Sequence, residues 1–438
     1  MSAPIAALKT AAESELAAHY AAARATLGGD LAARDAAFAQ FAKAGLPHRR
    51  IESWHYTDLR ARMRHALAPV ARPDAAAMAA AKAAPGQSAH GVRIVLLDGF
   101  YQPGLSALTA LPASIRIDAG DAQSPLALSG GALADPVAAL NRAFSTQTLK
   151  LTIAADAKIE APIEIVHLHS VPHPASAATQ LRINVGARAQ ATVIETRRRL
   201  GSGALALNDL VSLDIADHAH LHFISTCDGH LGETTQALLT LDARLGAHAQ
   251  FDCFGLITGG ALVRRQIFAT MAGPHARLGL RGLSLLRGAQ HADTTLTVDH
   301  AAPGGESREF FRHIIDDEAT GVFQGKIIVR PGAQKTDGGM KSNALLLGAD
   351  AAMMNKPELE IFADDVVCGH GATCGELDED HLFYLMARGI ARPEAEALLL
   401  EAFALEALEG VGDEALRAGL EKEIAVWLTA RSPEEKRA

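Results

Sequence analysis

The residues best suited to chemistry lie in one short segment, ADDVVCGHGATCGELDED (363–380), which places Cys368, His370 and Cys374 in C-x-H and C-x5-C spacing. On an extended chain Cys368 and His370 point to the same side, because successive side chains alternate between the two faces of a strand. A thiolate and an imidazole together suit iron or zinc. One strand supplies at most two ligands, whereas a closed metal site needs four. The spacing therefore leaves two interpretations open: a half-site shared between subunits, or a buried cysteine beside a structural histidine.

Further histidines alternate along two predicted strands: His167 and His169, and then His218, His220 and His222. Such ladders could bind metal, but on the outer face of a solenoid they are usually solvated polar positions, and we favour that interpretation.

Other polar or sulfur-containing residues carry weaker signals. Asp316, Asp317 and Glu318 are expected to form a charged turn, and Cys227 and Cys253 to be small buried residues. The chain has no G-x-x-x-x-G-K-[ST] segment, so we do not expect it to hydrolyse nucleotide itself.

A long run of strand-like segments must position these residues. From residue 149 to 362, short apolar runs follow one another with almost no helical periodicity. Four segments repeat one pattern (GARAQATV, ADHAHLHF, GAHAQFDC, GPHARLGL), whose central alanines are Ala189, Ala219, Ala249 and Ala276. The small alanine suits a crowded corner, and we expect the glycine or aspartate before it to form the turn. The period favours a parallel β-helix of stacked coils, with an antiparallel sandwich as the alternative.

The sequence divides into four predicted segments: an N-terminal helical segment (1–90), a mixed α/β connection (91–147), the β-helix core (148–365) and a C-terminal helical partner-binding domain (366–438). In the first segment we expect Trp54 and Tyr56 to anchor a helical arm on the neighbouring domain. After residue 362 a loop and then helices are expected, with Asp378 as one N-cap. This bundle is predicted to cap the open end of the solenoid or to dock a partner.

Composition limits the classes of protein that fit. The chain has 438 residues, 49% of them hydrophobic, and a net charge of −9. These values exclude wholesale disorder and argue against a general nucleic-acid or membrane binder. Only four cysteines, no apolar window long enough to span a membrane and a charged N-terminus predict a cytoplasmic protein.

Four stretches resemble the SufB/SufD family of scaffold subunits in the SUF iron–sulfur cluster assembly machinery. They are ESWHYTDLR (52–60), QGKIIVRPGAQKTDGGMKSNALLL (324–347), KPELEIFADDVVCGHGAT (356–373) and LFYLMARGI (382–390). The C-G-H-G-A-T and W-x-Y-T forms are similar to the SufD branch. The resemblance implies a mainly β fold, a right-handed parallel β-helix between helical N- and C-terminal segments.

The resemblance also implies a function and partners. It suggests a non-catalytic scaffold that pairs with a SufB-like paralogue through the β-helix ends and binds a SufC-like ATPase through its C-terminal helices. A nascent iron–sulfur cluster or iron would lie at the shared interface, with nothing tightly bound to the isolated chain, which could form a homodimer. Cys368 and His370 would be the metal ligands there, His370 the stronger candidate, and no catalytic or cofactor-binding residue is assigned.

Three alternatives compete with this interpretation. The first is a SufB-like paralogue with the same scaffold role. The second is a β-helix enzyme acting on polysaccharide, which would need a groove lined by acidic and basic residues. The third is a stand-alone metal-binding protein that uses the histidine ladders.

Overall fold

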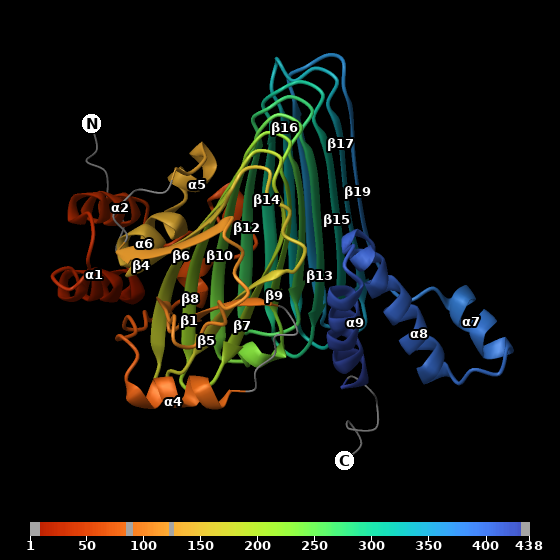
Figure 1. Ribbon diagram of the computed structural model, residues 1–438. Helices are drawn as coiled ribbons and strands as arrows, with labels where there is room; N and C mark the ends of the chain where they lie inside the picture. Colours follow the sequence, from red (N-terminus) through yellow and green to blue (C-terminus); the bar gives the residue numbers. More distant parts are fainter. Residues whose placement is uncertain (1–8, 85–90, 122–126, 431–438) are drawn as a thin grey trace, which may run out of the picture.

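The computed structural model describes residues 9–84, 91–121 and 127–430 (Figure 1). The parts of the predicted terminal segments at 1–8 and 431–438 lie outside the described residues, as do 85–90 and 122–126. Among the described residues, no helix combines the length and the apolar character that crossing a membrane requires.

Two long sheets face each other and form a parallel β-solenoid (Figure 1). Sheet I has ten strands in the order β19-β17-β15-β13-β11-β9-β7-β5-β1-β2, and sheet II has nine in the order β18-β16-β14-β12-β10-β8-β6-β4-β3. From β4 on, successive strands alternate between the sheets, and each pairs in parallel with the strand two further along the chain. Among the strands that the structure describes, only β1–β2 and β3–β4 pair antiparallel. The predicted stack of parallel coils is confirmed, and the antiparallel sandwich is excluded.

The strands of sheet I are β1 (Val92–Leu97), β2 (Phe100–Tyr101), β5 (Ile163–His169), β7 (Gln190–Arg199), β9 (His220–Cys227), β11 (Gln250–Ile257), β13 (Arg277–Leu286), β15 (Glu306–Ile315), β17 (Asp337–Leu346) and β19 (Val367–Gly375). Those of sheet II are β3 (Ile115–Asp121), β4 (Gln147–Ile153), β6 (Ala175–Val185), β8 (Leu205–Ile215), β10 (Thr235–Leu245), β12 (Leu262–Met271), β14 (His291–His300), β16 (Thr320–Val329) and β18 (Ala352–Ile361). The helices are α1 (Ala11–Ala23), α2 (Leu31–Ala44), η1 (Glu52–Trp54), α3 (Leu59–Arg62), α4 (Ala75–Ala83), α5 (Gly130–Ala134), α6 (Pro136–Phe144), η2 (Gly229–Leu231), α7 (Glu379–Ala387), α8 (Arg392–Leu405), η3 (Glu406–Gly410) and α9 (Glu414–Thr429).

The repeated alanines occupy the corners between coils, where each is completely buried. The predicted glycines and aspartate take part in the turns: the N–H of Ala189 bonds to Gly186 O and that of Ala249 to Gly246 O, and Asp217 is a turn residue. The left-handed residue is the one directly before the alanine, since Arg188, His218, His248 and His275 all have φ between 54° and 59°. The glycines also permit close packing. A Cβ added to Gly186 would lie 2.4 Å from the backbone nitrogen of Ala155 in the preceding coil. Glycine therefore lets two coils approach at this corner.

Helices α1, α2 and α6 lie on the outer face of sheet II, whereas α4 packs against β1 and β5 of sheet I. The Trp54 side chain is buried with Leu238 and Leu262 of that sheet, and the Arg264 guanidinium of β12 lies 3.7 Å from its ring centroid. The predicted anchor is thus confirmed for Trp54, whereas Tyr56 is only half-buried. Apolar burial and a cation–π contact together hold this segment on the solenoid.

The C-terminal helices pack beside the solenoid. Leu400 of α8, Leu408 of η3 and Trp427 of α9 share a buried cluster with Ile224 and Phe254, which point outward from sheet I. The prediction that this bundle caps the open end is wrong, because its apolar face covers the side of a sheet (Figure 1). The predicted loop is present at residues 362–366, but helices do not follow it directly, because strand β19 comes next and pairs with β17 along nine residues. The last coil therefore keeps an open edge.

Candidate metal interface at the open end of the solenoid

The last two strands, β18 and β19, form the open end. Each pairs on one side only, with β16 and β17, and no other strand among the described residues covers its second edge. Large apolar side chains project from this end, with Phe362 59% and Val367 73% exposed. An uncovered strand edge offers backbone N–H and C=O groups that can pair with another chain.

Cys368 and His370 both lie on β19, in register with Gly338 and Met340 of β17. The Cys368 side chain is half-buried against the core between the two sheets, and His370 is exposed. Because the two residues are two apart on one strand, they share a face. The thiol and the imidazole therefore lie together where the solenoid interior opens.

The surroundings of Cys368 act on its thiol. Burial raises the pKa of Cys368 and the Asp337 carboxylate raises it further, while the backbone N–H of Gly338 lowers it. The thiol is therefore protonated near neutral pH unless a cation binds, since a thiolate here would have no compensating charge.

Glu309 is a residue of this region that sequence reasoning missed. It lies on β15 in register with Met340, which is in turn in register with His370. Its side chain is almost completely buried, and burial raises the pKa of its carboxyl to about 8. The sequence pattern that could have revealed it is the two-residue period of β15: Glu309 lies two residues from both Ser307 and Phe311, and all three side chains are on the buried face of the strand.

Cys374 does not join this pair. It occupies the same strand in register with Ala344, six residues beyond Cys368, or about 20 Å at ~3.3 Å per residue. The C-x5-C spacing therefore does not create a common site. Within the described ranges, Cys368 and His370 also belong to no group of three potential ligands whose atoms converge. Among the residues that the structure describes, this group therefore supplies two ligands, fewer than a closed site needs.

The other predicted residues are distributed as follows. Cys227 and Cys253 are buried as expected, and Asp316 to Glu318 form the turn between β15 and β16. The expectation that the first histidine ladder is solvated is wrong, because His167 and His169 are buried within sheet I.

His167 is buried beside a group of ion-paired side chains inside the solenoid. His167 lies 3.0 Å from Glu195, and Arg197 forms ion pairs with Glu195 at 2.9 Å and with Asp209 at 2.8 Å. Buried charges persist when they are paired in this way. Burial lowers the pKa of His169 to about 3, so this imidazole is neutral.

Comparison with known proteins identifies the family. A family model described as "SUF system FeS cluster assembly, SufBD core domain" matches residues 169–403, more than half of the chain. The chain belongs to the SufBD family. The matched region runs from the end of β5 through most of α8 and includes β19 with Cys368 and His370.

Individual SufBD relatives align over most of their length. The iron–sulfur cluster assembly protein SufD of Escherichia coli is 28% identical over 90% of this chain and 91% of its own. A SufBD family iron–sulfur cluster assembly protein of Synechocystis is 29% identical over 84% of each chain. Another, from Mycobacterium tuberculosis, is 27% identical over 87% of this chain and 90% of its own. The resemblance found in the four sequence stretches is confirmed, and with it membership in an iron–sulfur cluster assembly family.

Proposed function

We propose that the chain is a non-catalytic scaffold subunit that contributes one half of a cluster-building site. The observation that carries the proposal is the position of Cys368 and His370 on an uncovered edge strand, without a third converging ligand among the described residues. A soft thiol and an imidazole at a subunit edge suit iron or a nascent iron–sulfur cluster, whose remaining ligands a second subunit would supply.

The partner at the open end would be a SufB-like paralogue. Exposed apolar side chains and unpaired strand edges are features of a surface that another β-solenoid could extend. Because the same edge is available in every copy, the isolated chain could pair with itself as a homodimer. A SufB-like role for this chain would use the same edge, and it remains the second candidate.

A SufC-like ATPase would bind at the C-terminal helices. Helix α7 packs against α8 and lies away from both sheets (Figure 1). Its Phe383 and Tyr384 side chains are 73% and 57% exposed, and Met386 is 42% exposed. Aromatic residues and methionine are enriched in protein interfaces. We expect the complex to work in the cytoplasm, in keeping with the low cysteine content.

The test is complementation of a SUF-deficient strain with His370→Ala and Cys368→Ser variants. We expect His370→Ala to fail to restore cluster assembly while the purified protein stays folded and still co-purifies with both partners. Cys374→Ser is the matched control, because it changes a cysteine of the same strand outside the proposed site. Normal cluster assembly by His370→Ala would contradict the ligand role, and loss of partner binding would indicate an interface role instead.

A further inference from the structure

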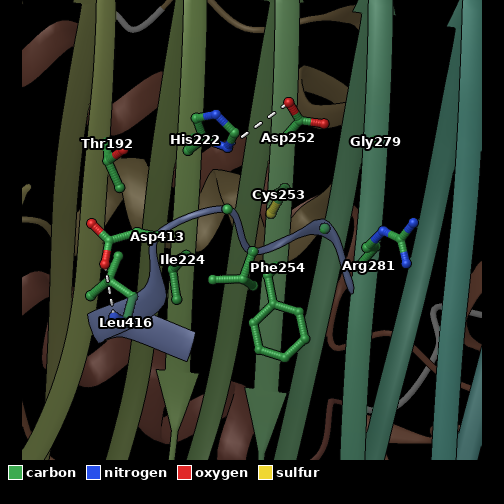
Figure 2. A pocket seen from close by; sticks show the side chains of 13 residues that line it. Thr192, His222, Ile224, Asp252, Cys253, Phe254, Gly279, Arg281, Asp413 and Leu416 are labelled. Atoms are coloured by element: carbon green, nitrogen blue, oxygen red, sulfur yellow. Dashed lines mark hydrogen bonds and ion pairs between the residues drawn. The ribbon is translucent and has the colours of Figure 1, made fainter. Parts of the chain in front are cut away.

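A second group of potential metal ligands lies on the outer face of sheet I, far from the open end. His220 and His222 of β9 alternate with Leu221 and Phe223, which point into the core. Asp252 of β11 is in register with His222 and projects from the same outer face (Figure 2). Five strand spacings separate β9 from β19, or about 24 Å at ~4.8 Å each, so the two groups are independent.

The three side chains converge. One ligand atom from each lies within 4.8 Å of the other two. The His220 Nε2 is 2.9 Å from the Asp252 carboxylate, the His222 Nδ1 is 3.9 Å from it, and the two imidazole centroids are 4.1 Å apart. Two ligand atoms bound to one ion at ~2.1 Å lie at most ~4 Å apart. Side-chain shifts below about 1 Å would therefore bring all three residues into bonding distance of one ion.

Two neighbouring residues affect the Asp252 carboxylate: one orients it, and the other keeps one of its oxygens accessible. The Gln250 side-chain amide donates a hydrogen bond of 2.8 Å to the Asp252 carboxylate. On the other side Gly279 is in register with Asp252, and a Cβ added there would lie 2.6 Å from the Asp252 Oδ1. A hydrogen bond to a ligating carboxylate orients it. Because Gly279 has no side chain, the Oδ1 atom of Asp252 stays accessible to a bound ion.

The C-terminal domain lies over this group. A pocket beside His222 and Asp252 is closed by Gly410, Val411, Gly412 and Asp413, the connection from η3 to α9 (Figure 2). The ligand side chains are between 27% and 35% exposed. The group is thus sheltered, while water can still fill the remaining positions of a bound ion.

We propose that His220, His222 and Asp252 bind one divalent transition-metal ion of the Zn²⁺ or Fe²⁺ class, beneath the connection between η3 and α9. Two imidazoles and one carboxylate suit such ions, and they leave positions open for water or a further ligand. This site goes beyond the proposed scaffold function. It is complete within one chain, so binding requires no partner subunit.

The test titrates metal-free full-length protein with ZnCl2 by calorimetry and with CoCl2 by visible absorption. We expect one ion per chain and a Co²⁺ d–d spectrum. His222→Ala and Asp252→Asn should each weaken binding about 10-fold or more. Gly279→Ala should also weaken Zn²⁺ binding, because the added methyl group crowds the Asp252 carboxylate without removing a ligand.

Two control variants separate this site from the other histidine and cysteine groups. His248→Asn changes the stacked corner histidines His218, His248 and His275, and asparagine tolerates the left-handed backbone there. A Cys368→Ser/His370→Ala double variant removes the ligands at the open end. Both should bind Zn²⁺ as the unmodified chain does. Absence of binding, or binding lost only in a control variant, would overturn the proposal. Because the readout needs no partner, its failure is distinct from failure of the scaffold function.

Discussion

His370 and Glu309 occupy equivalent register positions on β19 and β15, with Met340 of β17 between them. An exposed imidazole at the open end is therefore followed, two strands inward, by a buried carboxyl group. The sheet register places both on the face toward the solenoid interior, where a partner subunit covering the open end would enclose them.

Glu309 is expected to make the stability of the protein depend on pH. The pKa of its carboxyl is raised from 4.5 to about 8 by burial, so the folded state holds a proton that the unfolded chain releases between these values. Stability contributed by the protonated group is therefore lost as pH rises from about 4.5 to about 8, by up to a few kcal/mol. Urea unfolding at pH 5.5, 7 and 8.5 should show Glu309→Gln reducing this loss, with exposed Glu306→Gln as control. An unchanged pH dependence would contradict the assignment.

Replacing Arg197 should destabilise the solenoid strongly. Its guanidinium bridges Glu195 and Asp209, and all three side chains are about 2% exposed or less. Arg197→Met leaves two buried carboxylates without their cation, at a cost of about 3–5 kcal/mol in the free energy of unfolding. Chemical denaturation measures this. Arg330→Ala, which removes an exposed pair with Asp299, should cost only about 0–1 kcal/mol. Similar losses for both variants would show that the buried pairing is unimportant.

Trp54 is expected to hold the N-terminal helices on sheet II. Its ring is buried against Leu238 and Leu262 and stacks with Arg264. Trp54→Ala should lower stability by about 3–5 kcal/mol and expose the segment before β1 to proteases. Limited proteolysis followed by mass spectrometry locates the cleavage. Tyr56→Ala, at a half-buried position of the same segment, should leave the digestion pattern nearly unchanged, and equal sensitivity of both variants would argue against a specific anchor.

Helix α7 should contribute to partner binding with little effect on folding. Phe383→Ser removes a side chain that is 73% exposed, so the free energy of unfolding should change by less than about 0.5 kcal/mol. Binding to a SufC-like ATPase, measured by co-purification and calorimetry, should weaken at least 10-fold if this aromatic residue is a central contact. Leu398→Ser is the control, because it also replaces an exposed apolar side chain with serine, on α8 instead of α7. Unchanged affinity in Phe383→Ser would place the ATPase elsewhere.

Local patterns in the sequence determined much of the fold. The alanine repeat predicted stacked coils because a crowded corner accepts only a small side chain, and all four alanines are completely buried. The predicted N-cap Asp378 is confirmed in the same way, because its side chain accepts hydrogen bonds from the backbone N–H groups of Asp380 and His381. Because these features depend on residues close together in the chain, they can be predicted from the sequence alone.

Only the tertiary structure decided which residues meet between coils. Asp252 follows His222 by 30 residues, the spacing of Ala219 and Ala249, yet the repeat alone did not show that both project outward beside the C-terminal domain. It also did not reveal Glu309 behind His370, or the edge left uncovered when the last helices packed against sheet I. Alternation along a strand fixes two faces, but the stacking register and the packing of distant helices determine which face is buried. Those choices depend on contacts between segments far apart in the chain.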